Sequence, residues 1–352
     1  IVGGALAFSP DGSILASGGE GAVIRLWDPV TGDEVRPPLE GHRYASRWVD
    51  FSPDGRRIVS GSFELSYYPG PLRSDLPPDP PPGRAIRIWD VATGVCVTQM
   101  AVGPDVCYVA FIDGGSKVVS SHWHGEVRFW DAESGAEVES PIGPVKSAEP
   151  TLGLNADRTV LATAPPLRLW DIASGELLAE YPGLEGNKVA LSPDGSWLAL
   201  QSAAEPVGTI QRIDLRSGAV LETLAGHERQ YWAIVIAPDG RLMATPSEDA
   251  TVRLWTVGTA DSPSLLRVHD QAVAGLAFSP DGSRIASIAQ SGAVVVSDAI
   301  GGARLASIET PGRALPGIAY SPDGRRLAAM MEDESTILWD ANTGERLWFR
   351  EE

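Results

Sequence analysis

Two histidines in the stretch SHWHG, His122 and His124, are the residues whose type and spacing suggest chemistry most directly. On a β-strand, side chains two residues apart lie on the same face, so both imidazoles would reach a single metal ion. A metal site normally needs a third ligand, and the chain's five histidines include none at a matching spacing. We therefore expect a turn with exposed polar and aromatic side chains here, and we keep a metal site as the alternative.

The other reactive residues predict no catalytic centre and no cofactor. Cys96 and Cys107 are the only two cysteines, and their spacing fits neither a disulfide framework nor a haem-attachment motif. Phosphate-binding glycine loops of the standard patterns are absent from the sequence. Most aspartates recur at repeated turn positions, so no pair of carboxylates is identified as a general acid and base. We expect a protein that is not an enzyme.

Charge and hydropathy narrow the range of partners. Acidic residues outnumber basic ones 46 to 28, which gives a net charge of −18 and disfavours nucleic acid as a partner. No run of eighteen apolar residues is present, so we expect no membrane span. The chain starts at Ile1, without Met or a leader sequence. From this we expect a truncated start, a longer parent chain and a cytoplasmic location.

A repeated turn sequence organises the chain. SPDG occurs five times, APDG is a close variant, and two degenerate copies, FIDGG and LNADR, fill the gaps. Each copy is followed by a second landmark such as LWD, whose last residues are separated by 62, 41, 40, 43, 42, 42 and 42 positions. Only the first spacing is anomalous, by about twenty residues, and the proline-rich stretch YYPGPLRSDLPPDPPPG (67–83) lies inside it.

Local patterns within one unit predict β-strands throughout. Short runs of Val, Ile, Leu and Ala alternate with turn residues, as in 275–308. In SPDG, Pro fixes φ at the second position and Gly accepts a positive φ, which favours a tight hairpin. A TG or SG dipeptide marks a second turn. Each unit therefore predicts four short strands, a to d, of about four to six residues.

The spacing near 42, the Trp-Asp ends and the GH dipeptides at 41–42 and 226–227 resemble the WD40-repeat family. The resemblance implies an all-β fold, a single β-propeller over 1–352 with eight four-stranded blades; the alternative is seven blades plus an extra unit. The expected units are 1–40, 41–102, 103–143, 144–184, 185–226, 227–268, 269–310 and 311–352. Closure would depend on packing between the first and last blades.

The resemblance also implies a structural network in each blade, made by a His before strand a, a Ser or Thr on strand b, an Asp in the b–c turn and a Trp on strand c. The sixth unit has all four: His227, Thr245, Asp249 and Trp255. The second unit has His42, Ser60 and Trp89, but the proline-rich insertion (63–84) replaces its Asp. We expect these residues to be structural and not a catalytic triad.

The loops that join strand d to a and strand b to c lie on one face of a propeller, where the resemblance implies a platform for proteins or peptides. The insertion 63–84 falls in such a b–c loop, and the alternatives are a contact element or a surface insertion without a function. Candidate partner-binding residues are Tyr67, Tyr68, Arg73, Arg47, Trp123, His124, Arg229, Trp232 and Glu248.

The sequence predicts a non-enzymatic scaffold or sensor module that binds a protein or peptide, or other domains of its own chain. We expect it to belong to a multidomain signalling protein. Two alternatives stay open: a propeller enzyme or metal site around His122 and His124, and an architectural ring in a larger assembly.

Overall fold

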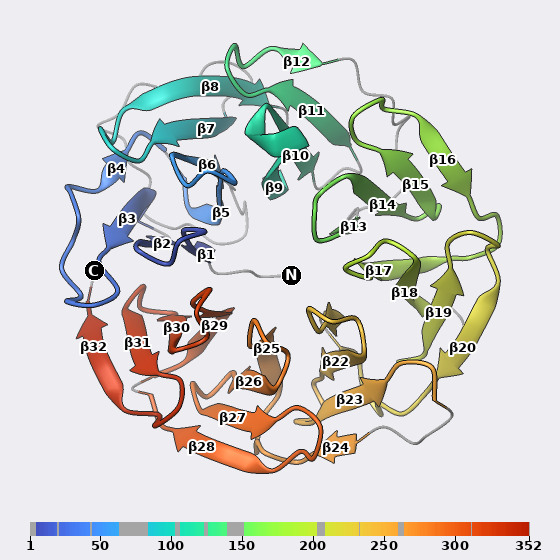
Figure 1. Ribbon diagram of the computed structural model, residues 1–352. Coiled ribbons are helices and arrows are strands. Elements are labelled where there is room, and N and C mark those ends of the chain that lie inside the picture. The colour runs from blue at the N-terminus through green and yellow to red at the C-terminus, as the bar shows by residue number, and fades with distance from the viewer. Residues whose placement is uncertain are drawn as a thin grey trace. The chain divides into compact units, whose positions relative to one another are not determined.

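The computed structural model describes residues 5–19, 21–42, 44–62, 84–102, 106–122, 126–138, 151–202, 208–231, 233–259, 264–310 and 312–351. Within these residues the chain forms eight antiparallel sheets of four strands, and in each sheet the strands are hydrogen-bonded in chain order (Figure 1). The predicted all-β propeller with eight four-stranded blades is confirmed, and the alternative with seven blades is wrong. We number the sheets as blades one to eight.

The chain divides into two compact units, which are described separately. The first comprises residues 2–150 and 348–352, and the second comprises 151–347. The predicted single domain over 1–352 and its unit boundaries stay predictions. No helix of the described residues is long and apolar enough to cross a membrane.

The first unit holds blades one to three. Blade one consists of β1 (Ala5–Phe8), β2 (Leu15–Gly18), β3 (Val23–Trp27) and β4 (Leu39–Glu40). Blade two consists of β5 (Ser46–Phe51), β6 (Arg57–Ser62), β7 (Arg84–Asp90) and β8 (Cys96–Val102). Blade three consists of β9 (Val106–Ile112), β10 (Lys117–His122), β11 (Val127–Asp131) and β12 (Glu137–Val138). A single 3-10 turn, η1 (Asp113–Gly115), takes the place of the SPDG turn in blade three.

The second unit holds blades four to seven and most of blade eight. Blade four consists of β13 (Thr151–Leu154), β14 (Val160–Ala164), β15 (Arg168–Asp171) and β16 (Leu177–Glu180). Blade five consists of β17 (Gly186–Leu191), β18 (Trp197–Ser202), β19 (Ile210–Asp214) and β20 (Val220–Leu224). Blade six consists of β21 (Val235–Ile236), β22 (Leu242–Pro246), β23 (Val252–Thr256) and β24 (Ser264–Leu266). Blade seven consists of β25 (Val273–Phe278), β26 (Arg284–Ala289), β27 (Val294–Asp298) and β28 (Arg304–Ile308). Blade eight consists of β29 (Ala314–Tyr320), β30 (Arg326–Met331), β31 (Thr336–Asp340) and β32 (Arg346–Arg350).

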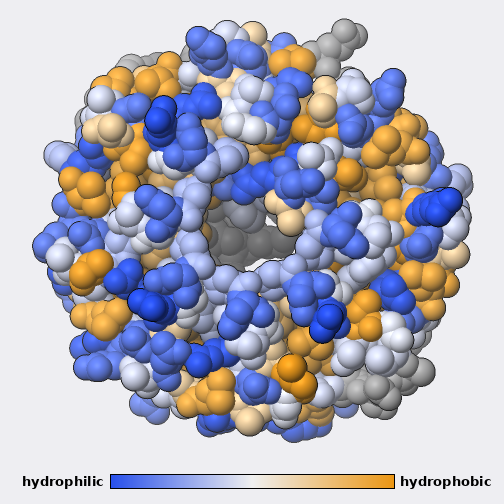
Figure 2. All heavy atoms as spheres, in the orientation of Figure 1, coloured by the Kyte–Doolittle hydropathy of each residue, from blue (hydrophilic) through white to orange (hydrophobic). Residues whose placement is uncertain are grey.

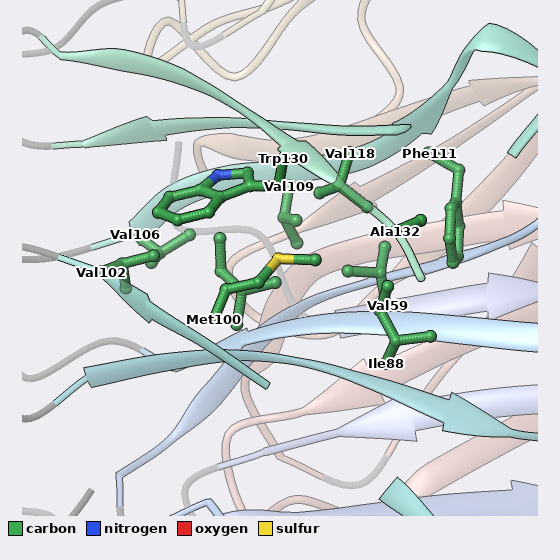
Figure 3. Close-up of a cluster of buried hydrophobic side chains, with 11 residues drawn as sticks. Val59, Ile88, Met100, Val102, Val106, Val109, Phe111, Val118, Trp130 and Ala132 are labelled. Carbon is green, nitrogen blue, oxygen red and sulfur yellow. The ribbon is translucent and has the colours of Figure 1, made fainter. Parts of the chain in front are cut away.

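Burial of apolar faces between neighbouring sheets builds the core. Figure 3 shows one such cluster, in which Val59, Ile88 and Met100 of blade two pack against Phe111 and Trp130 of blade three. A four-stranded sheet with two apolar faces must cover both, and a neighbouring sheet provides the cover. Hydrophilic residues predominate on the face in Figure 2, with apolar residues interspersed among them.

The a–b hairpins follow the predicted turn chemistry. In blade one, Ser9 donates its hydroxyl to Asp11 Oδ1 at 2.6 Å and accepts the amide of Ile14 at 2.9 Å. Gly12 has a φ of 71°, which the turn requires. The Ser9 hydroxyl and the amide and hydroxyl of Ser13 hold the pKa of Asp11 below its usual value. The SPDG repeat is therefore a self-contained hydrogen-bonded turn, and its carboxylate has a structural role.

The c–d turn glycines contact the last strand of the preceding blade. A Cβ on Gly135 would lie 2.9 Å from the carbonyl oxygen of Gln99 in β8, so only glycine fits this position. In three further pairs a Cβ on the glycine would meet a side chain of the preceding outer strand: Gly94 and Leu39 of β4, Gly302 and Leu266 of β24, and Gly344 and Ile308 of β28. A Cβ on Gly32 of blade one would meet Trp348 of β32, within the first unit.

Candidate partner-binding loops

Blade six contains a continuous hydrogen-bond network around a buried threonine. His227 lies 2.9 Å from Asp249 through Nδ1 and 2.7 Å from the Thr245 hydroxyl through Nε2. Trp255 donates its indole N–H to the same hydroxyl at 3.1 Å. The residues Thr245, Trp255 and His227 are 0%, 2% and 5% exposed. The four residues that the sequence places in this network therefore lie together in the structure.

Charge and geometry assign the donors in this network. Burial lowers the pKa of His227, against the opposing effect of Asp249, so the imidazole is neutral near pH 7. Burial alone would raise the pKa of Asp249, but hydrogen bonds from Thr251 and His227 bring it down to about 2. Because the carboxylate only accepts, Nδ1 of His227 carries the proton, and the Thr245 hydroxyl donates to Nε2. That hydroxyl also receives the Trp255 N–H, so it is not available as a nucleophile.

The network connects the d–a loop of blade six to its b–c turn. The amide of Glu248 donates to the carbonyl of Gln230 at 3.0 Å, and the Ser247 hydroxyl donates to the same carbonyl at 2.9 Å. The amide of Glu228 donates to Asp249 at 3.2 Å. Arg229 is exposed beside these contacts, and Glu248 is half-buried. Two of the predicted partner-binding residues are thus brought together on loops that are fixed by hydrogen bonds.

The GH dipeptide has a packing explanation in the same blade. A Cβ on Gly226 would lie 2.6 Å from the guanidinium of Arg253 on β23. A larger residue before His227 would displace either the arginine or the histidine. Gly41 has a similar position beside Arg87 in blade two, with a closest distance of 3.3 Å to the guanidinium.

Blade two has a network that lacks an aspartate. His42 Nε2 lies 2.7 Å from the Ser60 hydroxyl, and Trp89 donates to that hydroxyl at 2.8 Å. Nδ1 of His42 has no hydrogen-bond partner among the described residues. Burial, and secondarily the charge of Arg87, lowers the pKa of His42 to about 3. The insertion that replaces the aspartate falls between β6 and β7, which pair directly from Arg57 opposite Asp90 onward.

Blade three forms its network with His122, so the expectation of exposed polar side chains in SHWHG is wrong for this residue. His122, at the end of β10, is 1% exposed and lies 2.9 Å from the Ser120 hydroxyl, which also accepts the Trp130 N–H at 2.8 Å. The histidine here comes from strand b, two residues after the serine, and not from the d–a loop. The alternation of side chains along a strand, together with the Ser-x-His spacing, was the available signal.

Blade seven lacks the tryptophan of this network. His269 Nε2 lies 2.7 Å from the Ser287 hydroxyl, and Ser297 occupies the tryptophan position. The Ser297 hydroxyl and Nδ1 of His269 are buried without a hydrogen-bond partner among the residues that the structure describes. Burial, with the charge of Arg304, lowers the pKa of His269 to about 4.

Several predicted partner-binding residues lie outside the described residues. These are Tyr67, Tyr68 and Arg73 of the insertion, Trp123 and His124 of the SHWHG stretch, and Trp232. Arg47 is on β5, and its side chain is not described. Among the described residues, no three His, Cys, Asp or Glu side chains are grouped as a metal site would require.

The comparison with known proteins now identifies the family. A profile of the WD domain, G-beta repeat family matches residues 4–28, 34–65, 218–256 and 262–296. Each of the last three segments begins just before the outer strand of one blade and continues into the next, so that together the four segments overlap blades one, two, five, six and seven; the other blades have the same four-stranded pattern. The chain is a WD40-repeat β-propeller. In this WD40 propeller, the matched segments contain His42, His227 and His269, the histidines that precede strand a in blades two, six and seven.

Curated relatives of this WD40 propeller are similar over most of its length. Nuclear distribution protein PAC1 of Coccidioides posadasii is 29% identical over 285 residues, which cover 71% of this chain and 56% of that protein. PAC1 of Arthroderma otae is 26% identical over 284 residues, 71% of this chain and 58% of the relative. The serine-threonine kinase receptor-associated protein of Mus musculus is 22% identical over 248 residues, 70% and 53% of the two chains. The chain thus spans about half the length of these relatives.

Proposed function

We propose that this WD40 propeller is a non-enzymatic module that binds a protein or peptide through its d–a and b–c loops. The observation that carries the proposal is the hydrogen-bonded pair of loops in blade six, where Gln230 accepts from both Ser247 and Glu248. Loops that are held by a rigid scaffold lose little conformational entropy when they dock, which favours recognition. Exposed Arg229 and half-buried Glu248 supply the charged groups of this surface.

The proposal that the module is not an enzyme has its own support. The hydroxyls of Thr245 and Ser60 are fully buried, and each already bonds to a histidine and a tryptophan. A catalytic hydroxyl must reach a substrate, and these groups are enclosed by indole rings. Their hydrogen bonds fit a structural role, because a buried polar group needs a partner.

The wider setting is part of the same proposal. The names of two relatives refer to nuclear distribution, and that of a third refers to association with a kinase receptor. On this basis we propose a cytoplasmic scaffold or sensor domain, within a longer signalling chain, whose partner is a protein and not a nucleic acid. The insertion 63–84 and its tyrosines would extend the binding face on blade two.

An affinity-capture experiment tests this proposal. The intact chain, a variant with 64–83 replaced by a short glycine-containing turn, and Arg229→Ala would each be used to capture partners from a lysate of the source organism. Arg241→Ala is the matched control, because its side chain is 86% exposed in the a–b turn of the same blade. We expect specific partners to be lost with Arg229→Ala or the loop replacement and kept with Arg241→Ala. Identical partners for all four proteins would contradict the proposal.

A further inference from the structure

Three a–b turns share the sequence PDGR and differ at the residue before the proline. Blade two has SPDGR at 52–56, blade eight has SPDGR at 321–325, and blade six has APDGR at 237–241. In all three turns, the amide of the first residue donates to the carbonyl five residues later at 2.9 Å, and the glycine amide donates to the carbonyl of the first residue at 2.8 or 2.9 Å. The first residue of each turn is at most 1% exposed. The three turns therefore differ chiefly in whether one buried hydroxyl group is present.

In the two serine turns, that hydroxyl holds the aspartate side chain. Ser52 donates to Oδ1 of Asp54 at 2.6 Å, and Ser321 donates to Oδ1 of Asp323 at 2.5 Å. In each turn the serine hydroxyl is the largest cause that holds the pKa of the aspartate below its usual value. The serine therefore fixes the position of the carboxylate and also favours its ionised form.

Asp239 of blade six lacks this bond, because Ala237 has no hydroxyl to donate. Its carboxylate accepts the Arg241 amide at 2.9 Å and lies 3.9 Å from the Arg241 guanidinium, which is 86% exposed and so holds it weakly. The chain has seven Asp-Gly pairs, and the structure describes them all. Six of the aspartates accept a hydrogen bond from a serine hydroxyl: Asp11, Asp54, Asp113, Asp194, Asp281 and Asp323. Among these seven described pairs, only Asp239 accepts none.

An aspartate that precedes glycine can rearrange the backbone, because glycine has no Cβ to shield its amide nitrogen. That nitrogen attacks the side-chain carboxyl carbon, and the new C–N bond closes a five-membered succinimide ring. The hydroxyl of the protonated carboxyl group leaves as water together with the amide proton. Water then opens the ring. Where it breaks the bond between the nitrogen and the main-chain carbonyl carbon, the product is isoaspartate, which has the same mass as aspartate.

We infer that Asp239–Gly240 is a modification site, at which isoaspartate forms faster than at the matched pairs Asp54–Gly55 and Asp323–Gly324. The reaction needs a carboxyl group that turns toward the glycine nitrogen and takes up a proton. A serine hydroxyl opposes both steps, because its hydrogen bond fixes the carboxylate and stabilises the charged form. The side chain of Asp239 is 49% exposed and is held by one backbone amide. The inference does not depend on the proposed function.

Storage of the purified chain tests the inference. The protein would be kept for several weeks at neutral pH and body temperature, digested, and analysed by electron-transfer mass spectrometry, which distinguishes isoaspartate from aspartate in each peptide. We expect at least about fivefold more isoaspartate at position 239 than at position 54 or 323, since a hydrogen bond to a charged group stabilises the unreacted turn by at least that factor. Equal amounts at the three positions would overturn the inference.

Two reciprocal substitutions test whether the hydroxyl is the cause. Ala237→Ser supplies it in blade six, and we expect the isoaspartate at position 239 to fall to the level found at position 54 in the natural chain. Ser52→Ala removes it from blade two, and the isoaspartate at position 54 should rise toward the natural level at position 239. Thermal unfolding before storage shows that each variant is folded. An Ala237→Ser variant that keeps the natural level of isoaspartate at position 239 would also overturn the inference.

Discussion

The Thr245 hydroxyl makes two hydrogen bonds in blade six: it accepts the Trp255 N–H and donates to the neutral imidazole of His227. We expect Thr245→Val, which keeps the shape and removes both bonds, to lower the free energy of unfolding by about 2 kcal/mol, because two buried polar groups lose a partner. Chemical denaturation measures the change. Thr223→Val, at an exposed position on β20, is the control and should shift stability by less than about 0.5 kcal/mol.

Because the imidazole of His42 is buried and neutral, we expect the folded chain to lose stability in mild acid. The pKa of His42 is about 3 in the folded chain against its ordinary value of 6.5, so only the unfolded chain gains a proton between these two pH values. Stability from the neutral imidazole is complete above pH 6.5 and decreases as the pH falls toward 3. Between pH 7 and 5 we expect a loss of about 2 kcal/mol.

Comparison with His42→Gln isolates this contribution. The variant lacks the titrating group, so its free energy of unfolding should fall less between pH 7 and 5 than that of the natural chain. Urea titrations at the two pH values give the difference. Parallel losses in the two proteins would mean that His42 is protonated in the folded state.

Residue identity alone predicted some networks and not others. A histidine directly after glycine at 41–42 and 226–227 identifies the networks of blades two and six, because repeat spacing fixes their loop position. His122 was not recognised as a member of such a network, because it reaches its serine along β10 and no spacing between units reveals this. The missing partner of His42 was predictable, since the insertion replaces the aspartate.

At the scale of elements, we expect Gly→Ala at a c–d turn to cost more stability where the turn packs against the preceding blade than where it does not. Gly135 and Gly258 both have left-handed φ, 71° and 81°. A Cβ on Gly135 meets the Gln99 carbonyl, whereas a Cβ on Gly258 has no atom of the described residues within 4 Å. We expect Gly258→Ala to cost about 1 kcal/mol from φ alone, and Gly135→Ala at least about 1 kcal/mol more. Thermal and urea unfolding measure the stability of both variants. Equal losses of stability would show that the turn at Gly135 moves to accommodate a Cβ without cost.

Spacing predicted the elements better than it predicted their lengths. The period near 42 located eight four-stranded sheets, because each turn pair recurs at the same place in a unit. Strand lengths were expected at four to six residues, but β4 and β12 have two and β8 has seven. How far an outer strand pairs depends on contacts with its neighbouring strand, which local sequence does not encode.

At the scale of the whole chain, contacts between Trp348 and blade one link residues more than three hundred positions apart. The Trp348 indole donates to the carbonyl of Pro29 at 3.4 Å and packs against the ring of Trp27 with centroids 5.9 Å apart. Arg350 donates to the carbonyl of Gly32 at 2.8 Å. Blade one thus contacts the end of the chain through the same type of turn contact that other blades make with their predecessors.

This contact predicts a large effect from one C-terminal residue. Trp348 is 6% exposed, and we expect Trp348→Ala to lower the free energy of unfolding by about 3–5 kcal/mol. Hydrogen exchange in 29–35 should also accelerate, because these residues lose their cover. Leu347→Ala is the control at 45% exposure, with an expected change below about 1 kcal/mol. Similar effects of the two substitutions would refute a role for Trp348 in holding the end of the chain against blade one.

The central claim is that the d–a and b–c loops bind a partner, and the affinity of one captured partner for two variants of blade six tests it most directly. Arg229→Ala changes the loop face, and Arg241→Ala changes another exposed arginine in the a–b turn. The account predicts that Arg229→Ala weakens binding at least about fivefold, as expected for an interface arginine, while Arg241→Ala leaves it unchanged. Loss of affinity with Arg241→Ala and none with Arg229→Ala would contradict the account.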